Sequence, residues 1–158
     1  MPQTPSTSLK ERRRTDYGFF LPYQTRWSDN DQYAHINNSI YYHFFDSIIN
    51  TYLIQHCGLT PPSSPLIGLV VSSFCQYFSP ISFPVVLDLG LKVTTLGKSS
   101  VTYEVGVFEE GKDVPSAVGG YTHVFVENES RKSVKMDDTL RKGLEKLFRP
   151  PGELQAKL

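Results

Sequence analysis

The chain has 158 residues, 16 basic and 16 acidic side chains, and an aromatic content of 13%. This length suits one domain around a single core and is too short for two independent cores. A formal net charge of zero argues against nucleic acid as the main partner, because binding a phosphate backbone requires an excess of positive charge. A small anionic ligand held by two or three local cations is compatible with this balance.

The two cysteines, Cys57 and Cys75, have no CxxC spacing and are expected to be free thiols in a reducing compartment. No run of about 18 apolar residues is present, so no transmembrane helix is expected. These features make the cytoplasm the expected location.

Residues 1–17 are rich in Pro, Ser, Thr and Arg and lack the apolar block of a secretory signal. They predict a disordered tail, in which the run Arg12 to Arg14 is solvated. A mitochondrial transit segment is also rich in Ser and Arg, but Glu11 and two prolines weaken that alternative.

The strongest periodicity in the chain predicts a helix over residues 38–57. Apolar residues recur there in pairs four apart, which places a broad stripe on one helical face. The stripe consists of Ile40, Tyr41, Phe44, Phe45, Ile48, Ile49, Tyr52 and Leu53. Asn37 or Asn38 is a suitable N-cap, and Gly58 stands where a left-handed residue ends a helix.

The other segments predict strands, beginning with one near Phe19 to Trp27. Four more follow the helix, with alternating apolar residues and short turns between them. The predicted ranges are 66–78, 85–93, 101–107 and 117–126, followed by a short helix over 138–148 and a loose tail over 149–158. Short turns imply antiparallel neighbours, so the pattern predicts an α+β domain over residues 18–148 whose sheet curls around the long helix.

The segment between the first strand and the helix carries the chemistry. Asp29 and Asp31 lie just before the helix start, where unpaired backbone amides and the positive end of the helix dipole can hold a developing oxyanion. A carboxylate in that place can attack a bound carbonyl or activate water toward it. A thioester hydrolase needs these two elements together.

This segment resembles the 4-hydroxybenzoyl-CoA thioesterase group of hotdog-fold acyl-CoA thioesterases. The matching residues are Trp27, Asp29, Asp31, His35-Ile36-Asn37-Asn38, Tyr41 and Phe44-Phe45. The resemblance implies a hotdog fold, an antiparallel sheet of about five strands around one central helix, and hydrolysis of an acyl-CoA to free acid and CoA.

The resemblance also assigns roles to residues. Asp31 matches the catalytic carboxylate, and the backbone amide of Asn38 matches the oxyanion donor. His35 and Asn37 match positions that shape the loop and that have a catalytic role in related acyl-carrier-protein thioesterases. Tyr41 belongs to the matching motif and, as an aromatic residue near the helix start, is a candidate to line the acyl tunnel and bind substrate.

The family's coenzyme A contacts tend to come from strand ends and turns, partly from a neighbouring subunit. Lys98, Ser99 and Ser100 are the best match here, with Arg131 and Lys132 as weaker candidates. No metal and no cofactor are implied apart from the CoA of the substrate. A homodimer joined edge to edge, or a tetramer of such dimers, is the implied assembly.

Several of these residues also have an ordinary structural reading. Asp29 and Asp31 can bond amides of their own loop, Asn37 can simply cap the helix, and His35 can brace the loop. Residues 98–100 can be a plain polar turn, and Tyr41 can be a core aromatic.

Two other functions remain as alternatives. One is a non-catalytic acyl-CoA binder with the same fold. The other is a hotdog hydratase or dehydratase, whose Asp and His are separated by four residues, whereas three residues separate Asp31 from His35. The aromatic residues near the helix are compatible with an aromatic acyl group or with a medium-to-long aliphatic one.

Overall fold

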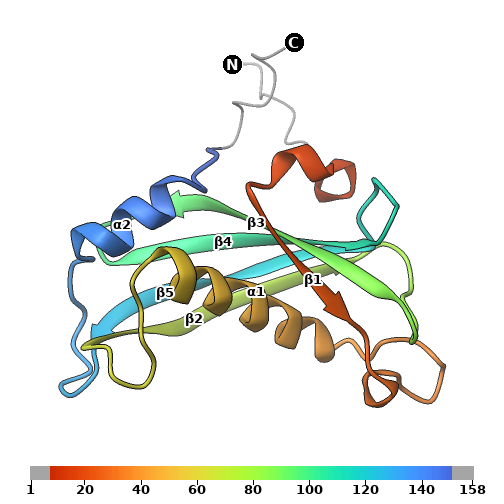
Figure 1. The fold of residues 1–158 in the computed structure, drawn as a ribbon, viewed down its shortest axis with the longest axis horizontal. Helices are drawn as coiled ribbons and strands as arrows, with labels where there is room; N and C mark the ends of the chain where they lie inside the picture. Colours follow the sequence, from red (N-terminus) through yellow and green to blue (C-terminus); the bar gives the residue numbers. More distant parts are fainter. Residues whose placement is uncertain (1–7, 151–158) are drawn as a thin grey trace, which may run out of the picture.

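A five-stranded antiparallel sheet curls around helix α1 in the computed structural model, which describes residues 8–150 (Figure 1). The strands are β1 Phe19–Gln24, β2 Leu66–Tyr77, β3 Val86–Leu96, β4 Ser100–Glu109 and β5 Ala117–Glu127. The helices are α1 Ile40–His56 and α2 Asp138–Glu145. The strand order is β1-β3-β4-β5-β2, and every pairing is antiparallel. The predicted α+β architecture, with the hotdog arrangement, is confirmed.

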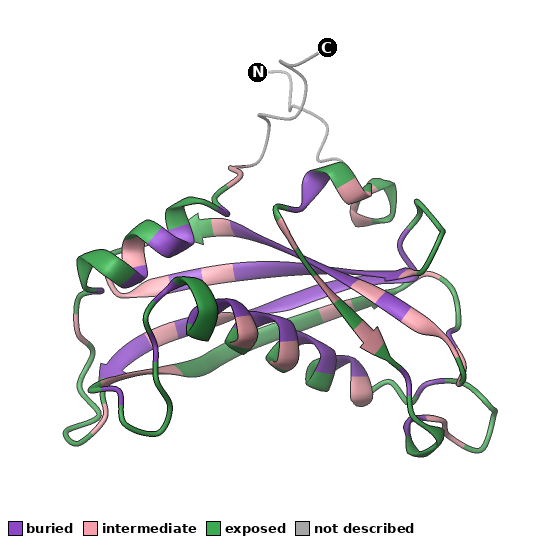
Figure 2. Ribbon diagram, in the orientation of Figure 1, coloured by how far each residue is buried: buried purple, intermediate pink, exposed green. Residues whose placement is uncertain are grey.

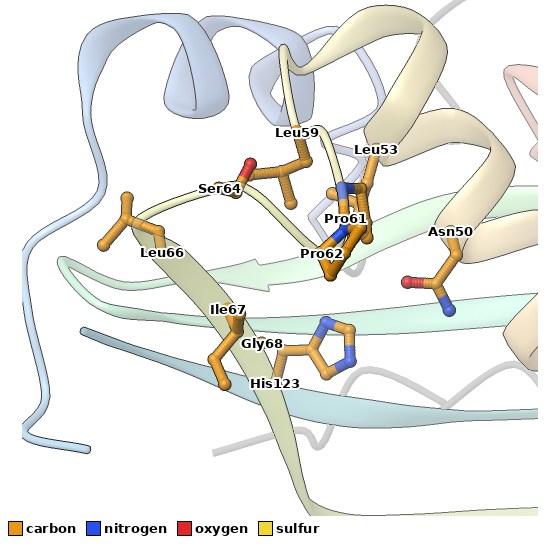
Figure 3. A pocket seen from close by; sticks show the side chains of 10 residues that line it. All are labelled: Asn50, Leu53, Leu59, Pro61, Pro62, Ser64, Leu66, Ile67, Gly68 and His123. Carbon is orange, nitrogen blue, oxygen red and sulfur yellow. The ribbon is translucent and has the colours of Figure 1, made fainter. Parts of the chain in front are cut away.

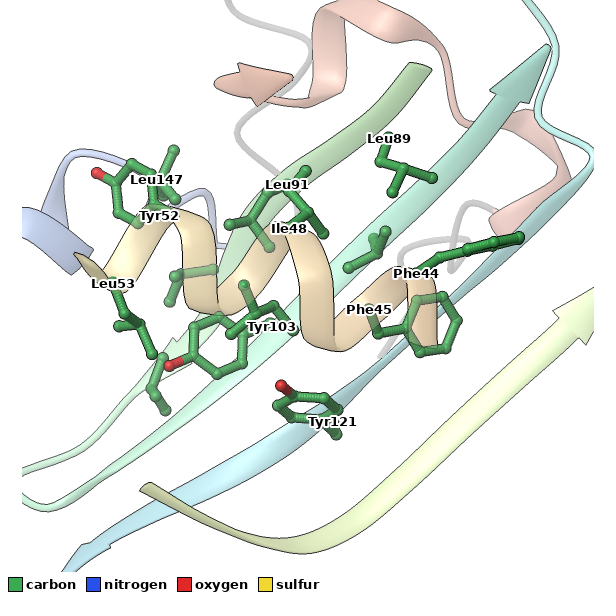
Figure 4. Packing of buried hydrophobic residues seen from close by; sticks show 14 of the residues in the cluster. Phe44, Phe45, Ile48, Tyr52, Leu53, Leu89, Leu91, Tyr103, Tyr121 and Leu147 are labelled. Carbon is green, nitrogen blue, oxygen red and sulfur yellow. The ribbon is translucent and has the colours of Figure 1, made fainter. Parts of the chain in front are cut away.

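The apolar stripe of α1 forms one side of the core (Figure 4). Seven of its eight predicted members are buried, from Tyr41 to Leu53, and they face the alternate residues of β3 and β4 that point inward. Figure 2 shows the helix buried along its inner side and exposed along its outer side. A helix with so wide an apolar face needs a curved sheet to cover it.

The helix is shorter than predicted at both ends. It begins at Ile40 because the side chain of Asn37 accepts the Ser39 amide at 3.0 Å and holds a tight turn there. It ends at His56, and Gly58 follows with a φ of +73°, the left-handed conformation expected of a helix-ending glycine.

The predicted C-terminal helix ends three residues early, at Glu145. The side chain of Asp137 caps its start by accepting the Leu140 amide at 2.8 Å. Phe148 and Arg149 then run beside Val93 of β3, where the Arg149 amide donates to the Val93 carbonyl. Residue 149 is thus attached to the sheet, and the tail predicted beyond it lies mostly outside the described residues.

The structure corrects the prediction of a tail over residues 8–17, while residues 1–7 lie outside the described part. Two short 3-10 turns, Leu9–Glu11 and Arg14–Asp16, lead to Tyr17, which is buried on the face of the sheet away from α1. Gly90 and Gly106 make room for its ring, since a Cβ on Gly106 would lie 2.7 Å from it.

Charges beneath this segment explain why it is held. Glu104 of β4 and Lys92 of β3 point away from α1 and are only 3% and 4% exposed. Arg12 forms a two-pronged pair with Glu104, at 2.9 and 3.0 Å, and the Tyr17 hydroxyl donates to the same carboxylate. Arg14 pairs with Asp88 at 2.8 Å. The arginines therefore satisfy acids on the sheet, and sequence periodicity alone gave no sign of these long-range partners.

Replacing Glu104 by Gln should lower the free energy of unfolding by about 3 kcal/mol, because Arg12 and Lys92 would lose their shared buried counter-charge. Urea unfolding measures this loss. The matched control is Glu145→Gln, whose pair with Arg141 is exposed and should contribute less than about 1 kcal/mol. Equal, small losses in the two variants would contradict the importance of the cluster.

A second buried polar pair lies on the inner face of the sheet. The imidazole of His123 in β5 is 4% exposed, and its Nδ1 lies 3.1 Å from the Tyr103 hydroxyl of β4. Burial lowers the pKa of His123 to about 4, so its ring is neutral in the folded protein at neutral pH.

This shift predicts a specific pH dependence of stability. Between about pH 6.5 and 4 the unfolded chain binds a proton at His123 that the folded chain does not, so stability falls as pH falls. From pH 7.5 to 5 this one group should remove about 2 kcal/mol. Urea unfolding at both pH values should show a smaller loss for His123→Gln than for wild type, while His56→Gln, at an exposed position, should behave as wild type. An unchanged loss in His123→Gln would contradict the assignment.

Candidate functional site

The loop between β1 and α1 is built on Asp29. This residue is fully buried, and its carboxylate accepts the Arg26 amide and guanidinium, both at 2.8 Å. Its carbonyl accepts the Asn37 amide at 2.9 Å. Asp29 therefore fixes both ends of the loop, in agreement with its predicted structural role.

Asp31 is half-buried within that loop. Its Oδ1 accepts the Tyr33 amide at 2.8 Å and the His35 amide at 3.4 Å, and its own amide donates to the His35 carbonyl at 2.8 Å. Ala34, with a φ of 62°, closes the tight turn. No hydrogen bond from residues 8–150 reaches Oδ2 of Asp31. One oxygen thus holds the carboxylate in place, and the other is free for chemistry.

The start of α1 presents an unpaired amide. Within the described part of the chain, the Asn38 N–H donates no hydrogen bond. The Asn38 carbonyl accepts the Tyr77 hydroxyl of β2 at 3.0 Å, and the Asn37 side chain accepts the Ser39 amide and hydroxyl. The Asn38 amide is therefore held in place but left without a partner, as an oxyanion donor requires.

His35 and Tyr41 have contrasting environments near this loop. His35 is exposed, and its ring bonds to no group among residues 8–150. Tyr41 is 3% exposed, with its ring edge-on to Phe44 and Tyr77. Burial raises the pKa of Tyr41 to about 12, so its hydroxyl stays protonated. In this chain His35 can meet a ligand directly, and Tyr41 forms part of the wall behind the helix start.

The predicted CoA-binding turn lies at the other end of the molecule. Lys98 and Ser99 lie in the turn that joins β3 to β4 beside α2, and Ser100 begins β4, whereas the Asp31 loop lies at the opposite end of α1 (Figure 1). The turn is tied down through the Ser99 carbonyl, which accepts the Phe125 amide, and through the Lys98 carbonyl, which accepts the Met136 amide. Since the 17 residues of α1 span about 25 Å, one chain does not bring Lys98, Ser99 and Ser100 to Asp31. Arg131 and Lys132, just after β5, are also outside the loop before α1.

A cavity of about 200 Å³ lies between the second half of α1 and the start of β2 (Figure 3). Its walls are mostly apolar, and His123 and Asn50 both line it. His123 and Asn50 were not among the site residues expected from the sequence. A signal was present, because the alternation of β5 places His123 on the same inward face as Tyr121 and Phe125.

The edge strand β2 is the most exposed strand of the sheet (Figure 2). Its large apolar side chains with more than a third of their surface exposed are Leu69, Val70, Val71, Phe74 and Tyr77. An edge strand of 12 residues with such side chains is a template for pairing with another strand.

Three further features of residues 8–150 concern the cysteines, metal binding and membrane-spanning helices. Cys57 and Cys75 are free, as predicted. Within these residues no cluster of His, Cys, Asp and Glu is suited to hold a metal ion. In the same part of the chain no helix is long and apolar enough to cross a membrane.

Comparison with known proteins relates this geometry to a family. The PA5185 protein of Pseudomonas aeruginosa is 48% identical in sequence, and its crystal structure matches with a TM-score of 0.84 over 86% of this chain and 95% of that one. The uncharacterized protein YsmA of Bacillus subtilis is 26% identical over 126 residues, which are 79% of this chain and 84% of that protein. A 1,4-dihydroxy-2-naphthoyl-CoA thioesterase from Synechocystis is 13% identical, with a TM-score of 0.72 over 80% of this chain and 94% of that one, and shares the fold.

The family model of the thioesterase superfamily matches residues 33–116, just over half of the chain. The match begins just after Asp31, includes the helix start at Asn38 and continues through α1, β2, β3 and β4. The sheet curled around α1 and this match agree with each other, and the chain therefore belongs to the thioesterase superfamily, a family of thioester hydrolases.

Proposed function

We propose that the protein hydrolyses an acyl-CoA thioester, with Asp31 as the catalytic carboxylate and the Asn38 amide as the oxyanion donor. The observation that supports this proposal is the pairing of a half-buried carboxylate, with one oxygen free, and an unpaired amide at the start of a 17-residue helix. His35 and Asn37 shape the loop between them. The reaction needs no cofactor beyond the CoA of the substrate.

Two routes use the same groups. In the first, Oδ2 of Asp31 bonds to the acyl carbon, the C–S bond breaks, CoA leaves as a thiolate that takes up a proton, and water then cleaves the anhydride. In the second, Asp31 takes a proton from a water molecule as that water attacks the acyl carbon, the C–S bond then breaks, and the departing CoA thiolate takes up a proton. In both routes the carbonyl oxygen gains negative charge, which the Asn38 N–H stabilises.

The proposed active form is a homodimer joined through β2, because residues 8–150 leave the outer edge of this long, apolar strand without a neighbouring strand. Two copies related by a twofold axis pair their β2 strands antiparallel. The Tyr77 end of one strand, which holds Asn38, then lies beside the Leu66 end of the other. Each active site thereby gains residues from the neighbouring chain, and Lys98, Ser99 and Ser100 of that chain are the candidates for CoA contacts.

A non-catalytic acyl-CoA binder is the alternative from another class. The free Oδ2 of Asp31 and the unpaired Asn38 amide favour the hydrolase over the binder, because binding alone requires neither group. The reducing environment of the cytoplasm, the proposed location, suits the free cysteines.

Replacing Asp31 by Asn should lower kcat/KM for the best acyl-CoA by at least about 10²-fold, as expected for loss of a catalytic base or nucleophile. Thiol release from a panel of aliphatic and aromatic acyl-CoA esters measures this. The matched control is Asp113→Asn, at an exposed turn between β4 and β5, which should retain wild-type activity. Full activity in Asp31→Asn would overturn the site assignment.

The same panel separates enzyme from binder. Trp27, the chain's only tryptophan, is 83% exposed close to Asp31, so its fluorescence can report ligand binding. Quenching by acyl-CoA esters without any thiol release would identify a binder.

Replacing Val71 by Asp should convert the dimer to a monomer, because a charge would be buried in the middle of the paired edge. Val71 is 60% exposed in the single chain. Sedimentation at micromolar concentration measures the mass, and Val114→Asp, a change of the same kind on the β4–β5 turn, should remain dimeric. A wild type that sediments as an active monomer would contradict the proposed assembly.

A further inference from the structure

Two hydroxyl groups from residues 77–83, the last residue of β2 and the connection that follows it, contact the loop between β1 and α1. The Tyr77 hydroxyl donates to the Asn38 carbonyl at 3.0 Å, and the Ser82 hydroxyl donates to the Ala34 carbonyl at 2.7 Å. These bonds join residues 39 and 48 positions apart in the sequence. They attach the loop at two points, one beside each candidate group of the site.

The connection that carries these hydroxyls is itself held by backbone hydrogen bonds. The Ile36 amide donates to the Ile81 carbonyl at 2.7 Å, and both side chains are buried. At the other end, the Phe78 and Ser79 amides both donate to the Ser116 carbonyl just before β5. The two hydroxyls therefore lie on a segment that is fixed to the core and to the sheet.

The Asp31 loop depends on an unfavourable backbone conformation at Ala34. Its φ is 62°, which brings the Cβ of an L-residue close to a carbonyl oxygen. This dihedral lies between the Tyr33 and His35 amides, the two donors to Oδ1 of Asp31. A return of Ala34 to a negative φ would turn the His35 amide away from the carboxylate.

Ser82 opposes that return through a single peptide group. The Ala34 carbonyl and the His35 N–H belong to the same peptide. Its oxygen accepts the Ser82 hydroxyl at 2.7 Å, and its N–H donates to Oδ1 of Asp31 at 3.4 Å. Because a peptide is planar, a bond that fixes its oxygen also fixes the direction of its N–H. Ser82 thus holds the turn in the conformation that orients Asp31.

Tyr77 acts in a similar way on the oxyanion donor. The peptide before Asn38 carries the free N–H, and its oxygen, the Asn37 carbonyl, accepts the Ile40 amide at 2.9 Å. The peptide after Asn38 is held by the Tyr77 hydroxyl. The Tyr77 ring lies edge-on to Tyr41, with centroids 4.9 Å apart. Since the ends of helices fray, a bond on each side of Asn38 keeps its amide in one direction.

We propose that Ser82 and Tyr77 are positioning residues of the hydrolase, Ser82 for the Asp31 carboxylate and Tyr77 for the Asn38 amide. Each acts through a backbone carbonyl and not on the reacting atoms. This inference rests on the proposed function. It adds that the geometry of the site is set partly by the connection between β2 and β3, which lies outside the loop that carries the candidate catalytic groups.

Replacing Ser82 by Ala should lower kcat for the best acyl-CoA about tenfold, because the carboxylate would leave its reactive position for part of the time. KM should change by less than about twofold, since the hydroxyl does not bind substrate. Thiol release measures both constants. Ser79→Ala is the matched control and should keep the wild-type kcat, because Ser79 is exposed in the same connection and its hydroxyl bonds to no group among residues 8–150.

A second substitution distinguishes positioning from a general loss of structure. Glycine adopts a positive φ without steric cost, so Ala34→Gly in the Ser82→Ala background should restore kcat to within about threefold of wild type. A general loss of stability would not be repaired in this way, because glycine adds freedom to the unfolded chain. Full activity in Ser82→Ala, or a tenfold loss that persists after Ala34→Gly, would overturn the role of Ser82.

Replacing Tyr77 by Phe removes only the hydroxyl and should also lower kcat about tenfold with little change in KM, because the oxyanion forms in the transition state. The control is Tyr42→Phe, which should keep the wild-type kcat. Tyr42 is exposed on α1, and its hydroxyl bonds to no group in the described part of the chain. A wild-type kcat in Tyr77→Phe would contradict the role of Tyr77.

Binding of a stable analogue separates loss of positioning from loss of folded sites. A thioether analogue of the best ester, with a methylene group between the sulfur and the carbonyl carbon, cannot be cleaved by hydrolysis. Ser82→Ala and Tyr77→Phe should bind it in calorimetry with the wild-type stoichiometry and a Kd within about twofold of wild type. A fall in the number of binding sites large enough to explain the fall in kcat would overturn the inference.

The outcomes also separate this inference from the proposed function. A wild type that hydrolyses acyl-CoA esters, together with fully active Ser82→Ala and Tyr77→Phe variants, would overturn the inference and leave the hydrolase standing. No thiol release by wild type from any ester would defeat the proposed function, and the two positioning roles with it.

Discussion

The burial of α1 is the constraint on which the structure depends. Seven of its 17 residues are buried, and they occupy a face too wide for a flat sheet to cover. The sheet therefore curls, and a curled sheet of five strands leaves β2 as an open edge and the two ends of α1 near its rims. The loop carrying Asp31 reaches one rim, and the cavity with His123 opens near the other. The Asp31 loop and the cavity are thus kept apart within one chain by the same packing that stabilises the fold.

In the proposed dimer, antiparallel pairing of two β2 edges would remove this separation. The Tyr77 end of β2 contacts Asn38 at the start of α1, and the Leu66 end of β2 lines the cavity. In the proposed dimer, a twofold axis through β2 therefore places the Tyr77 end of one chain beside the Leu66 end of the other. In that dimer, association of the two chains, rather than a lid or a hinge, would complete the site.

Much of the fold followed from periodicity in the sequence. The apolar pairs from Ile40 to Leu53 predicted α1, and the alternation in β3 and β4 predicted two inward faces, because such patterns reflect local geometry that each residue repeats. The position of the Asp31 loop was also expected, because a strand and a helix bound it in the sequence, and the catalytic role of Asp31 stays a prediction. The start of α1 at Ile40, two residues after the predicted start at residue 38, depended on a hydrogen bond from the Ser39 amide to the Asn37 side chain that no pattern specifies.

The features that escaped prediction are long-range. The N-terminal arginines were expected in solvent, but Arg12 meets Glu104, 92 residues away in the sequence. The cavity depends on how β2, β5 and the loop after α1 come together, and its one sequence trace is a histidine at an inward position of β5. Pairings of this kind are set by the folded arrangement, and composition or spacing does not encode them.

The segment that crosses the outer face of the sheet has a consequence for larger assemblies. Tyr17 fills the hollow above two glycines there, and Arg12 and Arg14 clamp it to acids on the strands. A partner that approached this face of the sheet would therefore meet residues 9–17, and displacing them would expose the buried Glu104 and Lys92. In a tetramer of the proposed dimers, a contact across this face would have to include these residues, whereas a contact on the helical side would not.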